Sequence, residues 1–313
     1  MNIHQFQYIL ALAETRHFEN AAEKCFISQS TLSTMISKFE DEVGIPVFDR
    51  RKKPVEVTLE GRVIIEQLKK ISKEIESLHE VTNQLKGEVK GTLTMAVIPT
   101  IAPFLLPLFL HRFASKFPNL HIEVREQTTS EIMRMIKSRD LDIGIISIPV
   151  HDPEIMEYPL YDESFVFYDA SSKNKKELTT KQVDVSNLCL LEEGHCMRNQ
   201  VLELCDFHKK ELNNKLNFRY KAGSIDSLLR FVKANKATTL LPFLAANELS
   251  KAEQKKISEF KTPIPFRSVG IVTHSHFVKH QIRELLAEDI LQEVKPLLQK
   301  TTIKGKQLMP MSS

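Results

Sequence analysis

Apolar residues recur with helical spacing through the first 40 residues of the chain. They predict a helix over residues 3–15, a short second helix over 19–24, and a third that starts at Ser28, a residue type favoured at helix N-caps. Uncharged polar side chains gather near the start of the third helix and face away from its apolar side: Gln29, Ser30, Thr31, Ser33 and Thr34. Such side chains hydrogen-bond to base edges and phosphates. The pattern therefore predicts a helix-turn-helix that binds double-stranded DNA.

A basic run follows these helices and leads into an alternating apolar and polar segment at residues 54–59. Two short strands around a basic tip would form a wing that contacts phosphates through Arg50, Arg51, Lys52 and Lys53. Residues 1–60 hold 7 Lys/Arg and 9 Asp/Glu, a net charge of −2, so the positive charge is local. Taken alone, the run could be a solvated loop. Beside a helix-turn-helix, we predict that it contacts DNA.

A long helix is predicted next, over residues 59–88. Its apolar positions advance by alternating steps of four and three residues: Ile64, Leu68, Ile71, Ile75, Leu78, Thr82 and Leu85. A heptad seam of this kind needs a partner helix, most simply from a second copy of the chain. The alternative is a helix packed on its own domain. A dimer would present two recognition helices to two DNA half-sites.

After Gly87 and Gly91 the pattern changes to strand-like runs separated by helical segments. Strands at 92–98, 121–126 and 141–147, with helices at 103–117 and 129–138 between them, predict a parallel α/β sheet. Later segments predict further strands at 164–168 and 268–273 and a last helix over 276–299. We expect two α/β lobes within residues 89–302, lobe I from about 89–161 and 268–302 and lobe II from about 162–267. Residues 303–313 are predicted to be disordered.

Composition adds few limits. The 313 residues are about twice a typical domain, and the net charge of +3 says little about partners. The N-terminus lacks the features of a signal peptide, and no apolar run approaches the length of a membrane span, so no membrane partner is expected. The four cysteines show neither CxxC nor zinc-ribbon spacing, which favours the thiol-reducing cytoplasm as the location. No cofactor is expected.

Two of the four cysteines, Cys196 and Cys205, bracket a predicted helix over residues 197–205. The positive end of the helix dipole, with His195 and Arg198 nearby, favours the reactive thiolate at Cys196. Nine residues of helix would hold the two sulfurs roughly 13 Å apart. A disulfide requires Cα atoms within about 7 Å, so a bridge could form only if the helix were dismantled. The alternative is that both are small buried hydrophobic residues.

The first 60 residues resemble the winged helix-turn-helix of LysR-type transcriptional regulators. The matching residues are Phe6, Ala11, Phe18, Ala21, Ala22, Ser28, Gln29, Leu32, Ser33, Ile36, Phe39, Glu40, Gly44, Phe48, Asp49, Arg50, Thr58 and Gly61. The long helix and the two-lobed domain complete that family's plan, in which the regulatory domain is periplasmic-binding-protein-like. The resemblance therefore covers about residues 1–300. Within the family, the segment from Gly194 to Cys205 resembles the redox stretch of the hydrogen peroxide sensors.

This resemblance implies that peroxide oxidises Cys196 and that a Cys196–Cys205 disulfide follows, activating antioxidant genes. Thr100 and Thr129, which each follow a predicted strand, match pocket positions together with Arg267. His195 is a further candidate for the pocket because it stands beside Cys196. The family plan also implies a homotetramer, with RNA polymerase as a candidate partner. Each pocket residue has a simpler interpretation: His195 at the surface, the threonines as helix caps, and Arg267 in an ion pair between lobes.

Three other functions remain open. A LysR-type regulator could bind a small-molecule effector in the cleft between the lobes and carry inert cysteines. An enzyme, a thiol peroxidase, could use Cys196 as its peroxidatic residue, but it would have no use for the helix-turn-helix or the heptad helix. A zinc site from His195, Cys196 and Cys205 lacks an evident fourth ligand. We therefore predict a redox-responsive regulator, without enzymatic activity and without a metal.

Overall fold

A computed structural model describes residues 1–171, 177–183, 187–192, 196–204, 222–298 and 303–310, with the side chains of residues 83 and 84 excepted. The chain divides into two compact units, Met1–Lys86 and Gly87–Ser313. The boundary between them lies at the end of the predicted long helix. Within the described residues, no helix is long and apolar enough to cross a membrane.

The first unit contains the three predicted N-terminal helices, α1 (Ile3–Thr15), α2 (Phe18–Lys24) and α3 (Gln29–Val43). Ser28 caps α3 by accepting a hydrogen bond from the backbone N–H of Thr31, and Gly44 ends the helix with a φ of +74°. The helices bury Ile9, Leu12, Leu32, Ile36 and Phe39 between them. The helix-turn-helix prediction is confirmed.

Two short antiparallel strands, β1 (Phe48–Asp49) and β2 (Glu56–Val57), form the predicted wing. One carboxylate oxygen of Glu40, on α3, accepts the backbone N–H groups of Val47 (2.7 Å) and Phe48 (3.1 Å). Because hydrogen bonds to an ionised acceptor are among the stronger ones, Glu40 fixes the start of the wing against α3.

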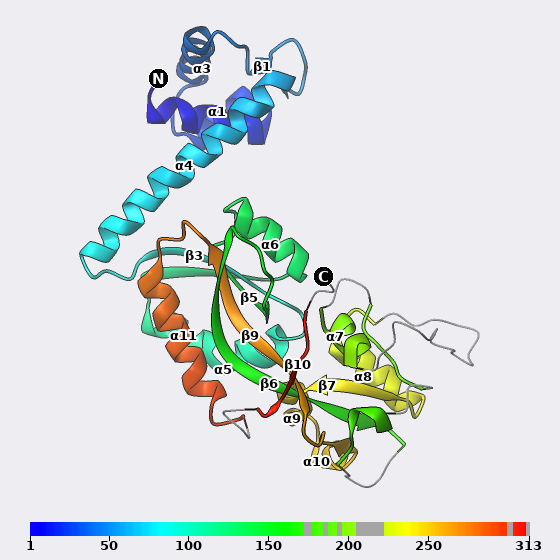
Figure 1. Cartoon of the computed structure of the whole chain (residues 1–313). Coiled ribbons are helices and arrows are strands. Elements are labelled where there is room, and N and C mark those ends of the chain that lie inside the picture. The colour runs from blue at the N-terminus through cyan, green and yellow to red at the C-terminus, as the bar shows by residue number, and fades with distance from the viewer. Residues whose placement is uncertain (172–176, 184–186, 193–195, 205–221, 299–302, 311–313) are drawn as a thin grey trace. The chain divides into compact units, whose positions relative to one another are not determined.

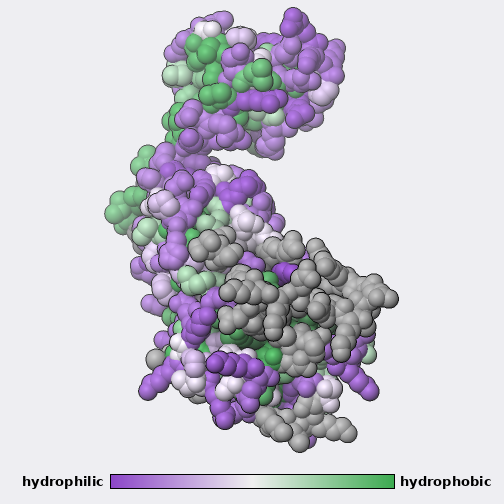
Figure 2. Space-filling model, turned by 45° about the vertical axis from the view of Figure 1, so that its right-hand side comes forward, coloured by the Kyte–Doolittle hydropathy of each residue, from purple (hydrophilic) through white to green (hydrophobic). Residues whose placement is uncertain are grey.

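The long helix α4 (Leu59–Leu85) changes character along its length. Ile65 and Leu68, in its first three turns, are buried against the helix-turn-helix. Beyond them Ile71 is 42% exposed, Leu78 66% and Leu85 85%. In the space-filling view, apolar patches interrupt a largely hydrophilic surface on this unit (Figure 2). An apolar stripe of this length is what an unpaired heptad seam presents.

The second unit begins with the predicted alternation of strands and helices: β3 (Gly91–Val97), α5 (Ala102–Lys116), β4 (Leu120–Glu126), α6 (Thr129–Lys137) and β5 (Ile143–Ile148). These three strands pair in parallel, with β3 in the middle. α11 (His280–Val294) lies beside α5 on this half of the unit (Figure 1). Their apolar side chains form one continuous buried cluster.

Two long strands connect this half to the rest of the unit. β6 (Ile155–Asp169) and β9 (Ile264–His274) pair with each other in antiparallel, and the sheet order is β4-β3-β5-β9-β6-β7. The remaining elements are η1 (Thr180–Gln182), α7 (Cys196–Leu204), α8 (Ile225–Ala234), β7 (Thr238–Pro242), α9 (Phe243–Asn247), α10 (Lys251–Gln254) and β8 (Ile257–Ser258). They surround a second buried cluster, so the unit has two cores joined by β6 and β9.

The prediction of a disordered tail is wrong for residues 303–310. β10 (Gly305–Gln307) pairs in parallel with β9, and Leu308 is fully buried in the second cluster. A Cβ at Gly305 would lie 1.8 Å from the carbonyl oxygen of Ile264, so only glycine lets the two strands approach this closely. Figure 1 shows this last strand (red) along β9.

Candidate functional site

A buried cluster of charged and polar groups joins the two halves of the second unit at Arg267, on β9. Its guanidinium is 1% exposed and forms an ion pair of 2.7 Å with Glu163, on β6. Arg267 also donates from Nη1 to the hydroxyl of Thr100 (3.0 Å) and from Nη2 to the carbonyl of Thr100 (3.1 Å). The second carboxylate oxygen of Glu163 accepts the backbone N–H of Leu244 (2.8 Å). One guanidinium therefore holds together segments that follow β3, lie on β6 and begin α9.

Thr100 is 1% exposed, and its hydroxyl is oriented by the hydrogen bond from Arg267. Because its oxygen accepts the Arg267 N–H, its hydrogen is left to donate to another group. Arg267 has five N–H groups, and its contacts with described residues use four of them. The cluster can thus supply further hydrogen bonds to an acceptor held beside it.

Three more buried hydroxyls lie near the same edge of the sheet. Those of Thr129, Ser147 and Tyr161 have no hydrogen-bond partner among the described residues. The backbone N–H of Gln127 donates to the carbonyl of Val97 (3.2 Å), which places the ends of β4 and β3, and hence the segments of Thr129 and Thr100, side by side. An unpaired buried hydroxyl costs about 1–3 kcal/mol, so such a group is expected where a ligand pairs with it.

The charged groups of the cluster also affect the pKa of Tyr161. Burial raises the pKa of its hydroxyl well above the ordinary value; the negative charge of Glu163 raises it further, and Arg267 opposes the shift. Tyr161 is therefore a neutral O–H donor at physiological pH.

Cys196 is the first residue of α7 and is 6% exposed. It packs with the first apolar cluster, whereas Met197 and Val201 of the same helix pack with the second. The N-terminal end of α7 thus lies where the two cores meet. The predicted helix is confirmed over residues 197–204. His195 and Cys205, which we predicted to act with Cys196, lie outside the described residues.

Cys25 and Cys189 are partly exposed. Burial raises the pKa of the Cys25 thiol, an effect that nearby Lys24 partly opposes, and burial also raises the pKa of Cys189. A raised pKa keeps a thiol protonated and unreactive. Among the described residues, no group of histidine, cysteine and carboxylate side chains has the arrangement to hold a metal ion.

The predicted DNA-contacting residues lie on α3 and the wing. Gln29, Ser30, Thr31 and Thr34 are exposed, and Ser33 is half-buried. Part of the basic run is held by carboxylates: Arg50 pairs with Glu40 (2.7 Å), Arg51 with Asp49 (3.0 Å) and Lys52 with Glu56 (2.6 Å). Arg51 nevertheless exposes 91% of its side chain. The pair between Lys52 and Glu56 is exposed on both sides, and ion pairs of this kind contribute little to stability.

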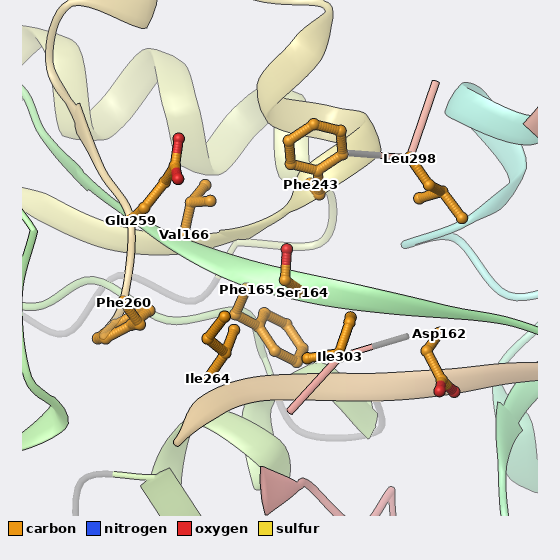
Figure 3. A pocket seen from close by; sticks show the side chains of 10 residues that line it. All are labelled: Asp162, Ser164, Phe165, Val166, Phe243, Glu259, Phe260, Ile264, Leu298 and Ile303. Carbon is orange, nitrogen blue, oxygen red and sulfur yellow. The ribbon is translucent and has the colours of Figure 1, made fainter. Parts of the chain in front are cut away.

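A small cavity of about 40 Å³ lies elsewhere in the second unit (Figure 3). It has room for about one or two water molecules. Its lining is mainly apolar, with Asp162, Ser164 and Glu259 as the polar members: Asp162, Ser164, Phe165, Val166, Phe243, Glu259, Phe260, Ile264, Leu298 and Ile303. The described peroxide-pocket residues, Thr100, Thr129 and Arg267, do not line it.

Sequence reasoning missed Glu163, which anchors Arg267. It also missed the hydroxyls of Ser147 and Tyr161. Glu163 had a detectable signal, since it is an acidic residue at the predicted crossing between lobes, just before the apolar run at 165–168. A buried carboxylate there requires a cationic partner, and Arg267 lies at the predicted return crossing. The two crossing segments could have been paired on that basis.

Comparison with known proteins accounts for both units. Residues 3–62 match the model of the bacterial regulatory helix-turn-helix protein, lysR family, and residues 86–290 match the LysR substrate binding domain. The chain is 31% identical to the DNA-binding transcriptional dual regulator OxyR of Escherichia coli (strain K12) over 293 residues, 93% of this chain and 95% of the relative.

Two solved structures are similar over nearly the whole chain. A full-length Cys-to-Asp variant of OxyR from Pseudomonas aeruginosa has 29% identity and a TM-score of 0.71, covering 93% of this chain and 98% of that one. A Cys-to-Ser variant of Corynebacterium glutamicum OxyR with bound H2O2 has 25% identity and a TM-score of 0.62, covering 95% and 93%. With both family models matched and a relative above 30% identity along most of its length, the chain belongs to the LysR family of bacterial transcriptional regulators.

Proposed function

We propose that this regulator senses hydrogen peroxide through Cys196 and converts the signal into a Cys196–Cys205 disulfide that changes how the chain binds DNA. The observation that carries the proposal is the position of Cys196, at the N-terminus of α7 where the two cores meet. Relatives with 30–31% identity are named as hydrogen peroxide-inducible genes activators, which supports the choice of peroxide as the signal.

The first step is oxidation of Cys196. Its thiolate attacks one peroxide oxygen, the O–O bond breaks, and the sulfur becomes a sulfenic acid while hydroxide leaves and is protonated to water. The sulfur loses two electrons and the peroxide gains them. Charge develops on the leaving oxygen, so hydrogen-bond donors lower the barrier. We assign this role to the hydroxyls of Thr100 and Thr129, to His195, and to the remaining Arg267 N–H.

The second step joins the two sulfurs. The Cys205 thiol attacks the Cys196 sulfenic acid, and the new S–S bond forms as water leaves. α7 is helical up to Leu204, whose Cα lies about 12 Å from that of Cys196. One further peptide unit spans only about 3.8 Å, whereas a disulfide requires Cα atoms within about 7 Å. α7 must therefore unwind before the bond can form, which makes oxidation a conformational switch. A thiol reductant restores both cysteines by exchange.

The N-terminal unit provides the output. We propose that Gln29, Ser30, Thr31, Ser33 and Thr34 enter the major groove and that Arg50, Arg51, Lys52 and Lys53 contact phosphates. The apolar stripe of α4 pairs two chains, and oxidation re-spaces their DNA-binding units within a tetramer.

Peroxide titration tests the proposal directly. Purified protein is treated with peroxide, digested and mapped by mass spectrometry, while DNA footprints are recorded for wild type and Cys205→Ser. We expect a Cys196–Cys205 peptide pair and an altered footprint in wild type only. Absence of that disulfide, or the same footprint change in Cys205→Ser, would show the switch to be wrong.

A second candidate function is a response to a small polar effector. The unpaired buried hydroxyls of Thr129, Ser147 and Tyr161 favour it, because they could pair with a ligand larger than peroxide. This alternative predicts thermal stabilisation by an organic effector and an unchanged response in Cys196→Ser.

A further inference from the structure

The last described residues, 303–310, form a segment that we call the C-terminal strap. It is tied to β9 by the pairing of β10 and by the backbone N–H of Leu308, which donates to the carbonyl of Phe266 (2.8 Å). Gln307 donates from its side-chain amide to the carbonyl of Ile148 (3.1 Å) and to the hydroxyl of Ser268 (3.0 Å). The strap is thus bound to the strand that carries Arg267.

The strap also grips α7. Gln200 is fully buried and donates from Nε2 to the carbonyl of Leu308 (3.0 Å). Glu203, one helical turn later, accepts the backbone N–H of Met309 (2.9 Å) and pairs with Lys306 at 3.0 Å. Gln200 and Glu203 lie three positions apart, so they project from the same face of the helix. Figure 1 shows the end of the strap beside α7.

α7 depends on such contacts. It has only nine residues, and isolated helices shorter than about 12–15 residues are marginal in water. Its order therefore comes from the packing of Met197 and Val201 in the second cluster and from the three contacts with the strap. These contacts require a helical α7, because Gln200 and Glu203 share one face only in the helix.

We propose that the C-terminal strap latches α7, so that it sets how readily peroxide produces the disulfide and is itself released when α7 unwinds. The inference rests on the proposed function. The two effects are thermodynamically linked. If binding of the strap stabilises the helical form of α7, then unwinding α7 reduces the binding free energy of the strap by the same amount. The strap thus binds α7 within the same chain, and its release accompanies oxidation.

Three variants test the latch without altering either cysteine. Glu203→Ala removes two contacts while placing the strongest helix former in α7. Lys306→Met removes the ion pair from the strap side. Gly305→Ala forces β10 away from β9 without changing α7, because its Cβ would clash with the carbonyl of Ile264. The matched control is Lys304→Met, an exposed strap residue for which the structure gives no side-chain contact to the described part of α7.

The readout is the rate of disulfide formation after one dose of peroxide, followed by quenching and mass spectrometry. We expect Glu203→Ala to form the disulfide about fivefold faster than wild type. This factor corresponds to a loss of about 1 kcal/mol in the stabilisation of helical α7 by the strap. Gly305→Ala should be faster as well, Lys306→Met about twofold faster, and Lys304→Met unchanged. If only intrinsic helix propensity mattered, Glu203→Ala would stabilise α7 and slow disulfide formation.

Amide hydrogen exchange at Leu308 and Met309 provides the reciprocal measurement. Both amides should exchange faster in the oxidised chain than in the reduced chain. Disulfide formation at wild-type rates in all three variants, or unchanged exchange after oxidation, would overturn the latch alone. A wild-type chain that forms no disulfide would overturn the latch together with the proposed function. Because Lys306 is on the surface, its variant keeps the test valid if another variant fails to fold.

Discussion

Replacing Glu163 with glutamine tests the buried cluster most sharply. Its carboxylate accepts hydrogen bonds from Arg267 Nε (2.8 Å) and from the backbone N–H of Leu244 (2.8 Å), and both charged side chains are 1% exposed. Glutamine is nearly the same size, but it is neutral and turns an N–H2 group toward donors. Glu163→Gln therefore leaves a guanidinium buried without its counter-charge.

The size of the effect follows from burial. Removing one partner of a buried ion pair costs about 3–5 kcal/mol, and solvent cannot screen a pair this deep. We expect Glu163→Gln to lower the free energy of unfolding by about 3 kcal/mol or more, measured by urea denaturation with circular dichroism. The matched control is Glu131→Gln, which breaks an exposed pair with Arg134 (2.7 Å) and should leave the free energy of unfolding nearly unchanged.

A double variant makes the reasoning refutable. In Glu163→Gln with Arg267→Met, neither buried charge remains, so the double variant should be more stable than the sum of the two single effects predicts. A loss below about 1 kcal/mol for Glu163→Gln, or strict additivity in the cycle, would show that the ion pair does not organise the cluster.

Further predictions concern the chemistry, assembly and pH response. Thr100→Val should slow peroxide oxidation of Cys196 by at least about tenfold, because it removes a donor to the leaving oxygen; stopped-flow rates that match wild type would contradict this role. Leu78→Glu places a charge on the exposed stripe of α4 and should shift the chain toward the monomer in analytical ultracentrifugation, whereas exposed Glu76→Gln should not. The hydrogen bond from Lys137 holds the pKa of Asp152 below its ordinary value, and burial opposes this shift. Because the folded-state pKa is lowered, this stability is present above about pH 4 and is lost as the pH falls below it. Asp152→Asn should therefore lower the urea midpoint at pH 6 and have a smaller effect at pH 3.

The sequence predicted best the parts of the fold that depend on local periodicity. The three N-terminal helices, the β3-to-β5 alternation and α7 follow from apolar spacing and capping residues such as Ser28. β6 and β9 are longer than predicted. β6 continues from one core into the other, so its apolar pattern changes along its length, and β9 pairs with β6 over most of its own length. The strap was missed for a related reason: three residues with a glycine form a strand only where an existing strand edge accepts them.

In the candidate site, single residues could likewise be predicted from the sequence, but the contacts between them could not. Thr100 could be named from the sequence because it follows a predicted strand, and Arg267 because it matches a pocket position of the family that the sequence resembles. Their hydrogen bond to one another joins residues 167 positions apart, and only the folded sheet brings them together. The same holds for the contact of Met309 with Glu203, which no local pattern indicates.

Hydrogen exchange across α7 tests the central claim most directly. Amides of residues 200–204 are measured in reduced protein and in protein whose Cys196–Cys205 disulfide has been verified by mass spectrometry. An ordered helix that must unwind for the sulfurs to meet predicts slow exchange before oxidation and fast exchange after it. A verified disulfide with the helix amides still protected, or rapid exchange already in the reduced chain, would contradict it.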